Sequence, residues 1–103
     1  MLGIFGSYDV VVAGAGVTGV VASAAAAREG ARTLLVEGTG VIGGLITGGR
    51  MTKPTGPVEG GIFREMIDRT QARGGADSST RTSYWGPYTS IFDPEVMQRV
   101  VLE

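Results

Sequence analysis

The chain has 103 residues, nine basic and ten acidic side chains, and neither Cys nor His. This length suits one small domain, and the near-neutral charge provides no basic surface for nucleic acid. The missing Cys and His exclude disulfides, thiol catalysis and most zinc sites. No apolar run reaches the roughly 20 residues of a membrane span, and the first residues lack a signal peptide. We therefore expect a cytoplasmic protein with no nucleic acid or membrane partner, in which a bound cofactor carries any redox chemistry.

The beginning of the chain predicts a strand, a helix and a second strand. Val10–Ala13 is an apolar, β-branched run, typical of a strand buried on both faces of a parallel sheet. Val17–Arg28 is rich in alanine, which favours a helix, and Glu29-Gly30 is a plausible stop. Residues 33–37 form the second apolar strand. The three segments together have the size of a βαβ unit.

The turn between the first strand and the helix reads GAGVTG. With 18 glycines in the chain, this spacing alone is weak evidence. Its position is stronger evidence, because Gly14, Gly16 and Gly19 follow a strand and open a helix, as in a dinucleotide-binding loop. Gly14 would allow the tight turn, Gly16 the close approach of a pyrophosphate, and Gly19 the packing of helix on strand. Glu37, at the end of the second strand, would bind a ribose and repel a 2′-phosphate, which favours FAD or NAD over NADP.

A glycine-rich segment and an amphipathic helix follow. Residues 38–57 contain seven glycines and two prolines, so we expect a long irregular loop, and loops of this length are usually functional or disordered. Residues 61–73 predict a helix with opposite charges four residues apart on its outer face. The pairs are Arg64–Asp68 and Glu65–Arg69, and the apolar face consists of Ile62, Phe63, Met66 and Ile67.

The last third of the chain predicts a loop, a small hairpin and a helix. Residues 76–83 are polar and loop-like, and residues 83–92 suit a hairpin with its turn at Gly86-Pro87. Asp93 and Pro94 are typical of an N-cap and a first helical position. The apolar face of this helix consists of Val96, Met97, Val100 and Val101. Since two parallel strands do not make a complete sheet, we expect residues 1–103 to be the N-terminal part of one domain, with the substrate domain absent.

Residues 9–49 resemble the N-terminal segment of FAD-dependent oxidoreductases with the glutathione-reductase-like dinucleotide-binding fold. The resemblance rests on DVVVAGAGVTGVVASAAAAREGARTLLVE and on GVIGGLITGG after it. It implies an α/β, Rossmann-like βαβ fold that binds FAD, followed by a glycine-rich loop and two helices. It assigns the pyrophosphate loop to Gly14, Ala15, Gly16, Val17, Thr18 and Gly19, and the adenosine ribose to Glu37 and Gly38. It assigns the backbone that runs along the cofactor to Gly43, Gly44 and Leu45, with Thr47 toward the flavin end.

Two other functions stay open at this point. The same loop serves an NAD-dependent dehydrogenase, and the chain would also fit an inactive truncated fragment that self-associates as a homo-oligomer through its exposed faces. An FAD-dependent oxidoreductase would act on a small-molecule substrate that these residues do not identify. No residue in the chain is a convincing catalytic acid or base.

Two further groups of residues have a functional and a structural interpretation. The aromatic side chains of Tyr84, Trp85, Tyr88 and Phe92 suit a substrate pocket, although packing under a loop is the favoured interpretation. Arg50 and Lys53, in the glycine-rich segment, suit an anionic substrate, although solvated surface charges are more common.

Overall fold

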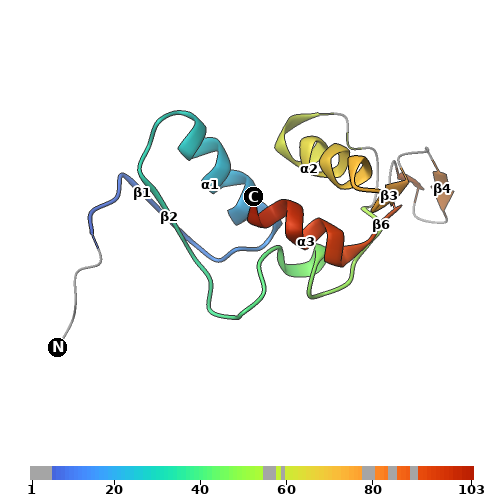
Figure 1. Ribbon diagram of the computed structural model, residues 1–103, viewed down its shortest axis with the longest axis horizontal. Coiled ribbons are helices and arrows are strands. Elements are labelled where there is room, and N and C mark those ends of the chain that lie inside the picture. Colours follow the sequence, from blue (N-terminus) through green and yellow to red (C-terminus); the bar gives the residue numbers. More distant parts are fainter. Residues whose placement is uncertain (1–5, 55–57, 59, 78–80, 84–85, 89–90) are drawn as a thin grey trace.

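The computed structural model describes residues 6–54, 58, 60–77, 81–83, 86–88 and 91–103. Its elements in chain order are β1 (Val10–Ala13), α1 (Val17–Arg28), β2 (Thr33–Val36), the 3₁₀ helix η1 (Gly44–Ile46), α2 (Gly61–Ala72), β3 (Ala76–Asp77), β4 (Arg81–Ser83), β5 (Gly86–Tyr88), β6 (Ile91–Phe92) and α3 (Pro94–Leu102). In Figure 1, the β1–α1–β2 unit lies at one end, and α2 and α3 lie side by side next to it. Each helix in the described part of the chain falls short of the length and apolar character that crossing a bilayer requires.

β1 and β2 are parallel neighbours, and α1 connects them, so the predicted strand–helix–strand unit is confirmed. The register pairs Val12 with Leu35, and these side chains face α1 and the core. On the opposite face, Val11 is 59% exposed and Val36 is 47% exposed. The prediction that β1 is buried on both faces is therefore wrong for this structure, because α1 covers one face of the sheet and no other described element covers the second.

The core lies where α1, α2 and α3 meet the glycine-rich segment. Both predicted amphipathic helices are confirmed, because α2 buries Met66 and Ile67 and α3 buries Met97 and Val100. Between α2 and α3, the fully buried Thr70 donates its hydroxyl to the Met66 carbonyl at 2.8 Å. Among the residues that the structure describes, the buried apolar side chains are Ala15, Val20, Ile46, Met66, Ile67, Phe92, Met97 and Val100.

The segment before α3 is more regular than we expected. β3 pairs antiparallel with β6, so the prediction of a loop over residues 76–83 is wrong. A hairpin is present, but β4 and β5 form it over residues 81–88 and not over 83–92 as predicted. Ser83 pairs with Gly86, so Gly86-Pro87 lies in a strand, and the predicted turn position is wrong. Both errors have the same cause, because these short strands are defined by pairing with partners that local composition does not reveal.

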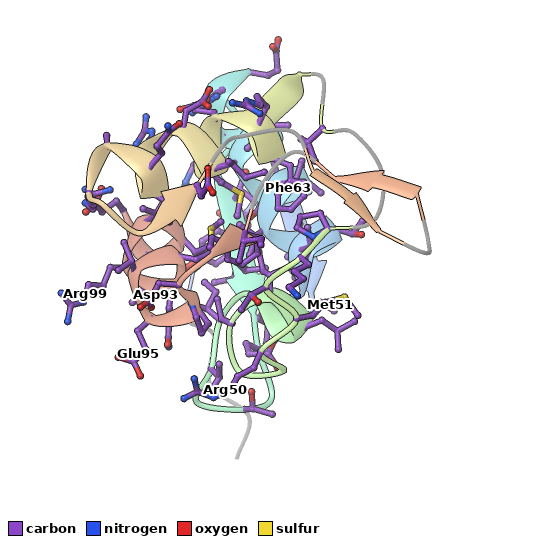
Figure 2. The ribbon with its side chains drawn as sticks, turned by 90° about the vertical axis from the view of Figure 1, so that its right-hand side faces the viewer. Arg50, Met51, Phe63, Asp93, Glu95 and Arg99 are labelled. Atoms are coloured by element: carbon purple, nitrogen blue, oxygen red, sulfur yellow. The ribbon has the colours of Figure 1, made fainter. Side chains whose placement is uncertain are left out.

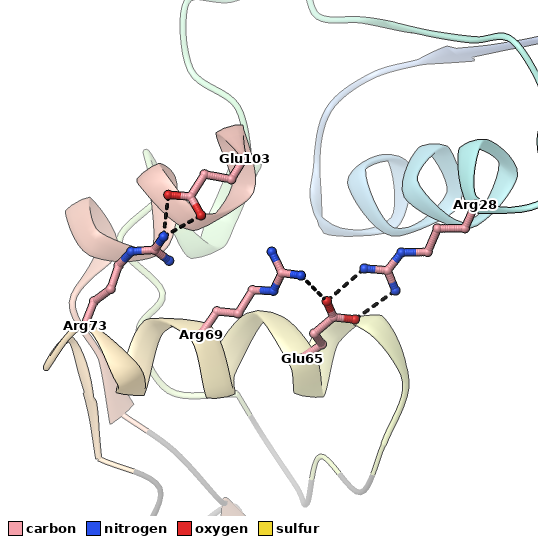
Figure 3. Close-up of polar contacts among 5 residues, drawn as sticks. All are labelled: Arg28, Glu65, Arg69, Arg73 and Glu103. Atoms are coloured by element: carbon pink, nitrogen blue, oxygen red, sulfur yellow. Dashed lines mark hydrogen bonds and ion pairs between the residues drawn. The ribbon is translucent and has the colours of Figure 1, made fainter.

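Ion pairs connect the helices on the outer surface (Figure 3). Arg28 of α1 forms two hydrogen bonds of 2.8 Å with the Glu65 carboxylate of α2, and Arg69 contacts the same carboxylate at 2.7 Å. The predicted pairing of Glu65 with Arg69 is thus confirmed, as is that of Arg64 with Asp68 at 2.8 Å. A further pair, Arg73 with Glu103, connects the ends of α2 and α3.

Candidate functional site

The turn from β1 to α1 is formed by glycines, and it leads directly into the helix. Gly14 has a φ of 99°, which favours glycine, and its N–H donates to the Val36 carbonyl at 2.7 Å. Gly16 is the N-cap of α1, and the first helical hydrogen bond runs from Val20 N to Gly16 O at 3.0 Å. The N–H groups of residues 17–19 therefore have no acceptor within the helix, and they give its N-terminus a partial positive charge.

The glycines of this turn differ in the space around them. A Cβ at Gly19 would lie 1.8 Å from the Gly14 carbonyl oxygen, so Gly19 is required for α1 to pack on the turn. A Cβ at Gly16 would meet nothing within 4 Å. The open space beside Gly16 borders the start of α1, where a phosphate would find unbonded N–H groups.

Glu37 follows β2 directly, and its carboxylate is hydrogen-bonded to the turn between β1 and α1. The Ala15 N–H donates to Glu37 Oε2 at 2.7 Å, and the Thr39 N–H donates to Oε1 at 3.2 Å. These bonds, that of Ala15 first, hold the pKa of Glu37 below its ordinary value. The lowered pKa favours the Glu37 anion. The Thr39 hydroxyl also donates to Oε1, at 3.5 Å, so these three donors occupy most of the roughly four acceptor positions of the carboxylate and leave about one for a ligand. Gly38 is exposed beside it.

The second glycine-rich segment packs against the first, backbone to backbone. The Gly43 N–H donates to the Ala15 carbonyl at 2.7 Å. A Cβ at Gly44 would lie 3.0 Å from the Cα of Gly16. Gly43 and Gly44 have φ values of 100° and 59°, so both occupy the left-handed region that glycine tolerates. The structure thus places the residues of the two predicted glycine segments next to one another.

Residues beyond this glycine pair have different environments. Leu45 is 61% exposed, whereas Thr47 is 4% exposed and donates its hydroxyl to the Ile42 carbonyl at 2.6 Å. Residues 38–54, the part of the glycine-rich segment that the structure describes, are irregular as expected, apart from η1. Sequence reasoning named Thr47 but missed this hydrogen bond, because nothing in the spacing of the two residues indicates it.

The charged candidates of the glycine-rich segment lie at the surface. Arg50 is labelled in Figure 2, and its guanidinium is 3.8 Å from the Glu95 carboxylate of α3. Arg50 has a φ of 53°, while Lys53 is exposed. This pairing was not expected from the sequence.

The structure describes only part of the group of aromatic candidates. Phe92 is 3% exposed and belongs to the core, which agrees with the packing interpretation. Tyr88 ends β5, and Tyr84 and Trp85 lie outside the described residues.

Comparison with known families identifies the class of protein. The family model described as FAD dependent oxidoreductase matches residues 9–103. The chain belongs to this family. Searches of curated proteins and of solved structures find no match. The match to the FAD dependent oxidoreductase family includes Glu37 and both glycine segments, and the parallel β1–β2 pair with α1 fits an α/β fold of the dinucleotide-binding type.

Proposed function

We propose that this chain binds the ADP half of FAD and thereby serves as the cofactor-binding part of a flavin-dependent oxidoreductase. The observation that carries the proposal is the hydrogen bond between the Ala15 N–H and Glu37. It brings the acid at the end of β2 onto the turn that opens α1. A ribose acceptor and a phosphate-binding helix N-terminus thus lie side by side, as an adenosine diphosphate requires.

The residues of the site fit the parts of this ligand. The pyrophosphate would lie at the start of α1, where Gly16 leaves open space and the helix offers unbonded N–H groups. Glu37 would accept hydrogen bonds from the ribose hydroxyls through the acceptor capacity that Ala15 and Thr39 leave. The backbone of residues 43–45 packs on this turn and would continue along the cofactor toward the flavin.

The division of chemical work follows from these residues. FAD supplies hydride and electron transfer when it is bound. The chain binds and orients the cofactor, and because Glu37 is held as an anion, it accepts hydrogen bonds instead of exchanging protons. Its charge would also repel a 2′-phosphate on the ribose.

Titration of the purified chain with FAD, NADH and NADPH tests the proposal. Selective binding of FAD, seen as a change in the flavin absorption spectrum and by calorimetry, is the expected result. Preferential binding of NADH would make the chain a nicotinamide-binding protein, and a chain that binds no FAD at all would contradict the proposal.

A variant of the turn locates the binding site. Gly16→Val places two methyl groups in the open space beside the start of α1 and should abolish FAD binding. Leu102→Ala is the control, because it also removes exposed apolar surface, but at the end of α3 and outside the residues proposed to hold the cofactor. An unchanged FAD affinity in Gly16→Val would place the cofactor elsewhere.

A further inference from the structure

The peptide unit between Ile42 and Gly43 is held at both ends. Its carbonyl oxygen accepts a hydrogen bond of 2.6 Å from the Thr47 hydroxyl. Its N–H, on Gly43, donates a hydrogen bond of 2.7 Å to the Ala15 carbonyl. Since a peptide unit is planar, fixing its carbonyl also fixes the direction of its N–H. The Thr47 hydroxyl and the Ala15 carbonyl thus bind opposite ends of one rigid peptide unit.

The surroundings of Thr47 leave its side chain little freedom. The residue is 4% exposed, and a Cβ at Gly43 would lie 2.5 Å from its methyl group and 2.7 Å from its hydroxyl oxygen. The Thr47 side chain thus packs directly on the α-carbon of Gly43, whose φ is 100°. The Thr47 hydroxyl is buried and bonded to a backbone carbonyl, and the Thr47 methyl group lies against Gly43. These two contacts together favour one orientation of the turn.

We propose that Thr47 is a positioning residue of the dinucleotide site. Its hydroxyl orients the Ile42–Gly43 peptide so that Gly43 holds the Ala15 carbonyl and Gly44 lies against Gly16. Ala15 also donates to Glu37, so the same contacts set the position of the ribose-binding acid relative to the pyrophosphate loop. This inference rests on the proposed FAD binding. The buried hydroxyl of Thr47 contributes to that binding by holding the backbone in place, and it does not itself touch the cofactor.

A comparison of buried threonines tests the inference. Thr47→Val removes the hydroxyl and keeps both branches of the side chain, and Thr47→Ser keeps the hydroxyl. Thr70→Val is the matched control, because Thr70 is also buried and also donates to a backbone carbonyl, but lies between α2 and α3. Each variant is measured for FAD affinity by calorimetry and for thermal unfolding.

We expect Thr47→Val to weaken FAD affinity by about tenfold, because the Ile42 carbonyl loses its donor and the peptide is released. Thr47→Ser should stay within about threefold of the wild type, and Thr70→Val within about twofold, since each keeps the hydrogen bond at Ile42. Equal affinities of Thr47→Val and wild type would overturn the inference. So would equal losses in the Val and Ser variants, or a loss in Thr70→Val as large as that in Thr47→Val.

Hydrogen exchange of the Gly43 amide gives a second measurement that needs no cofactor. The amide should exchange slowly in the wild type and in Thr47→Ser, and at least about tenfold faster in Thr47→Val. Slow exchange in all three would overturn the positioning role even where FAD binds. Failure of the wild type to bind FAD would instead overturn the proposed function. Should Thr47→Val not fold, Thr47→Ala removes the same hydroxyl and is judged by the same criteria.

Discussion

Ala15 and Glu37 lie 22 residues apart in the sequence and are joined by a hydrogen bond of 2.7 Å from backbone N–H to carboxylate. Ala15 is fully buried, and its carbonyl accepts the N–H of Gly43. One small residue therefore connects the acid after β2 with both glycine segments. Loss of any of these contacts should therefore change the shape of the whole candidate site, and the effect should not be limited to a single contact with a ligand.

The first prediction concerns the acceptor atoms of Glu37. Glu37→Ala removes both carboxylate oxygens, so it should weaken FAD affinity by about tenfold or more, because the ribose acceptor and the Ala15 contact are both lost. Glu37→Gln keeps one acceptor oxygen and should fall between Glu37→Ala and the wild type. Calorimetric titration with FAD measures this order. Glu29→Gln, a charge-removing change at the exposed end of α1, serves as the control, and an affinity of Glu37→Ala equal to that of the control would contradict the prediction.

The second prediction concerns the stability of the fold in acid. The pKa of Glu37 lies below its ordinary value of 4.5, chiefly because of the Ala15 N–H, and that of Glu65 lies below 4.5 chiefly because of Arg28. A folded-state pKa below the unfolded value means that the unfolded chain binds more protons in this range. These groups thus stabilise the fold above about pH 4.5, and the stabilisation is lost as the pH falls through their folded pKa values. Urea unfolding at a series of pH values should show a free energy of unfolding that declines below this point.

Neutral variants separate the two carboxylates. Glu37→Gln and Glu65→Gln should each flatten the decline below about pH 4.5, since neither side chain can then take up a proton. The double variant should flatten it further. A decline as steep in the double variant as in the wild type would assign the acid sensitivity to other groups.

The third prediction separates packing from ligand approach within the GAGVTG turn. Gly19→Ala places a Cβ 1.8 Å from the Gly14 carbonyl oxygen, so α1 must shift, at a cost of about 1–3 kcal/mol in the free energy of unfolding. The Cβ of Gly16→Ala meets nothing within 4 Å, so this variant should cost less than about 1 kcal/mol, but its methyl group would enter the space in which we propose that the pyrophosphate binds. Urea unfolding and FAD titration of both variants distinguish the two effects. A Gly16→Ala protein that is less stable than Gly19→Ala would contradict this assignment.

The local signals of the sequence predicted the first half of the fold well. Val10–Ala13 and Val17–Arg28 have the bounds that were expected, because an apolar β-branched run, a glycine turn and an alanine-rich run follow one another without ambiguity. Residues 76–77 were assigned to a loop and form β3 instead, since the partner strand, Ile91–Phe92, lies more than a dozen residues away. Two-residue strands have no internal periodicity from which they can be recognised.

The sequence predicted which residues belong to the candidate site, but it did not predict the contacts between them. Gly16 and Gly44 were each assigned to a close approach of the backbone to a ligand, while the structure also shows them approaching each other. The hydrogen bonds of Thr47 to Ile42 and of Gly43 to Ala15 depend on backbone orientation within an irregular segment. Sequence spacing carries no information on such orientation, because glycine permits many conformations there.

The last prediction concerns the start of α3, next to the glycine-rich segment. The Asp93 carboxylate accepts the N–H groups of Glu95 at 2.8 Å and Val96 at 3.2 Å, which makes Asp93 the N-cap that the sequence predicted. Asp93→Ala should lower the free energy of unfolding by about 1 kcal/mol, because these two N–H groups lose their acceptor. Asp93→Asn keeps a side-chain oxygen and should remain close to the wild type in urea unfolding. Equal destabilisation by both variants would mean that the charge of Asp93, and not its capping oxygen, stabilises α3.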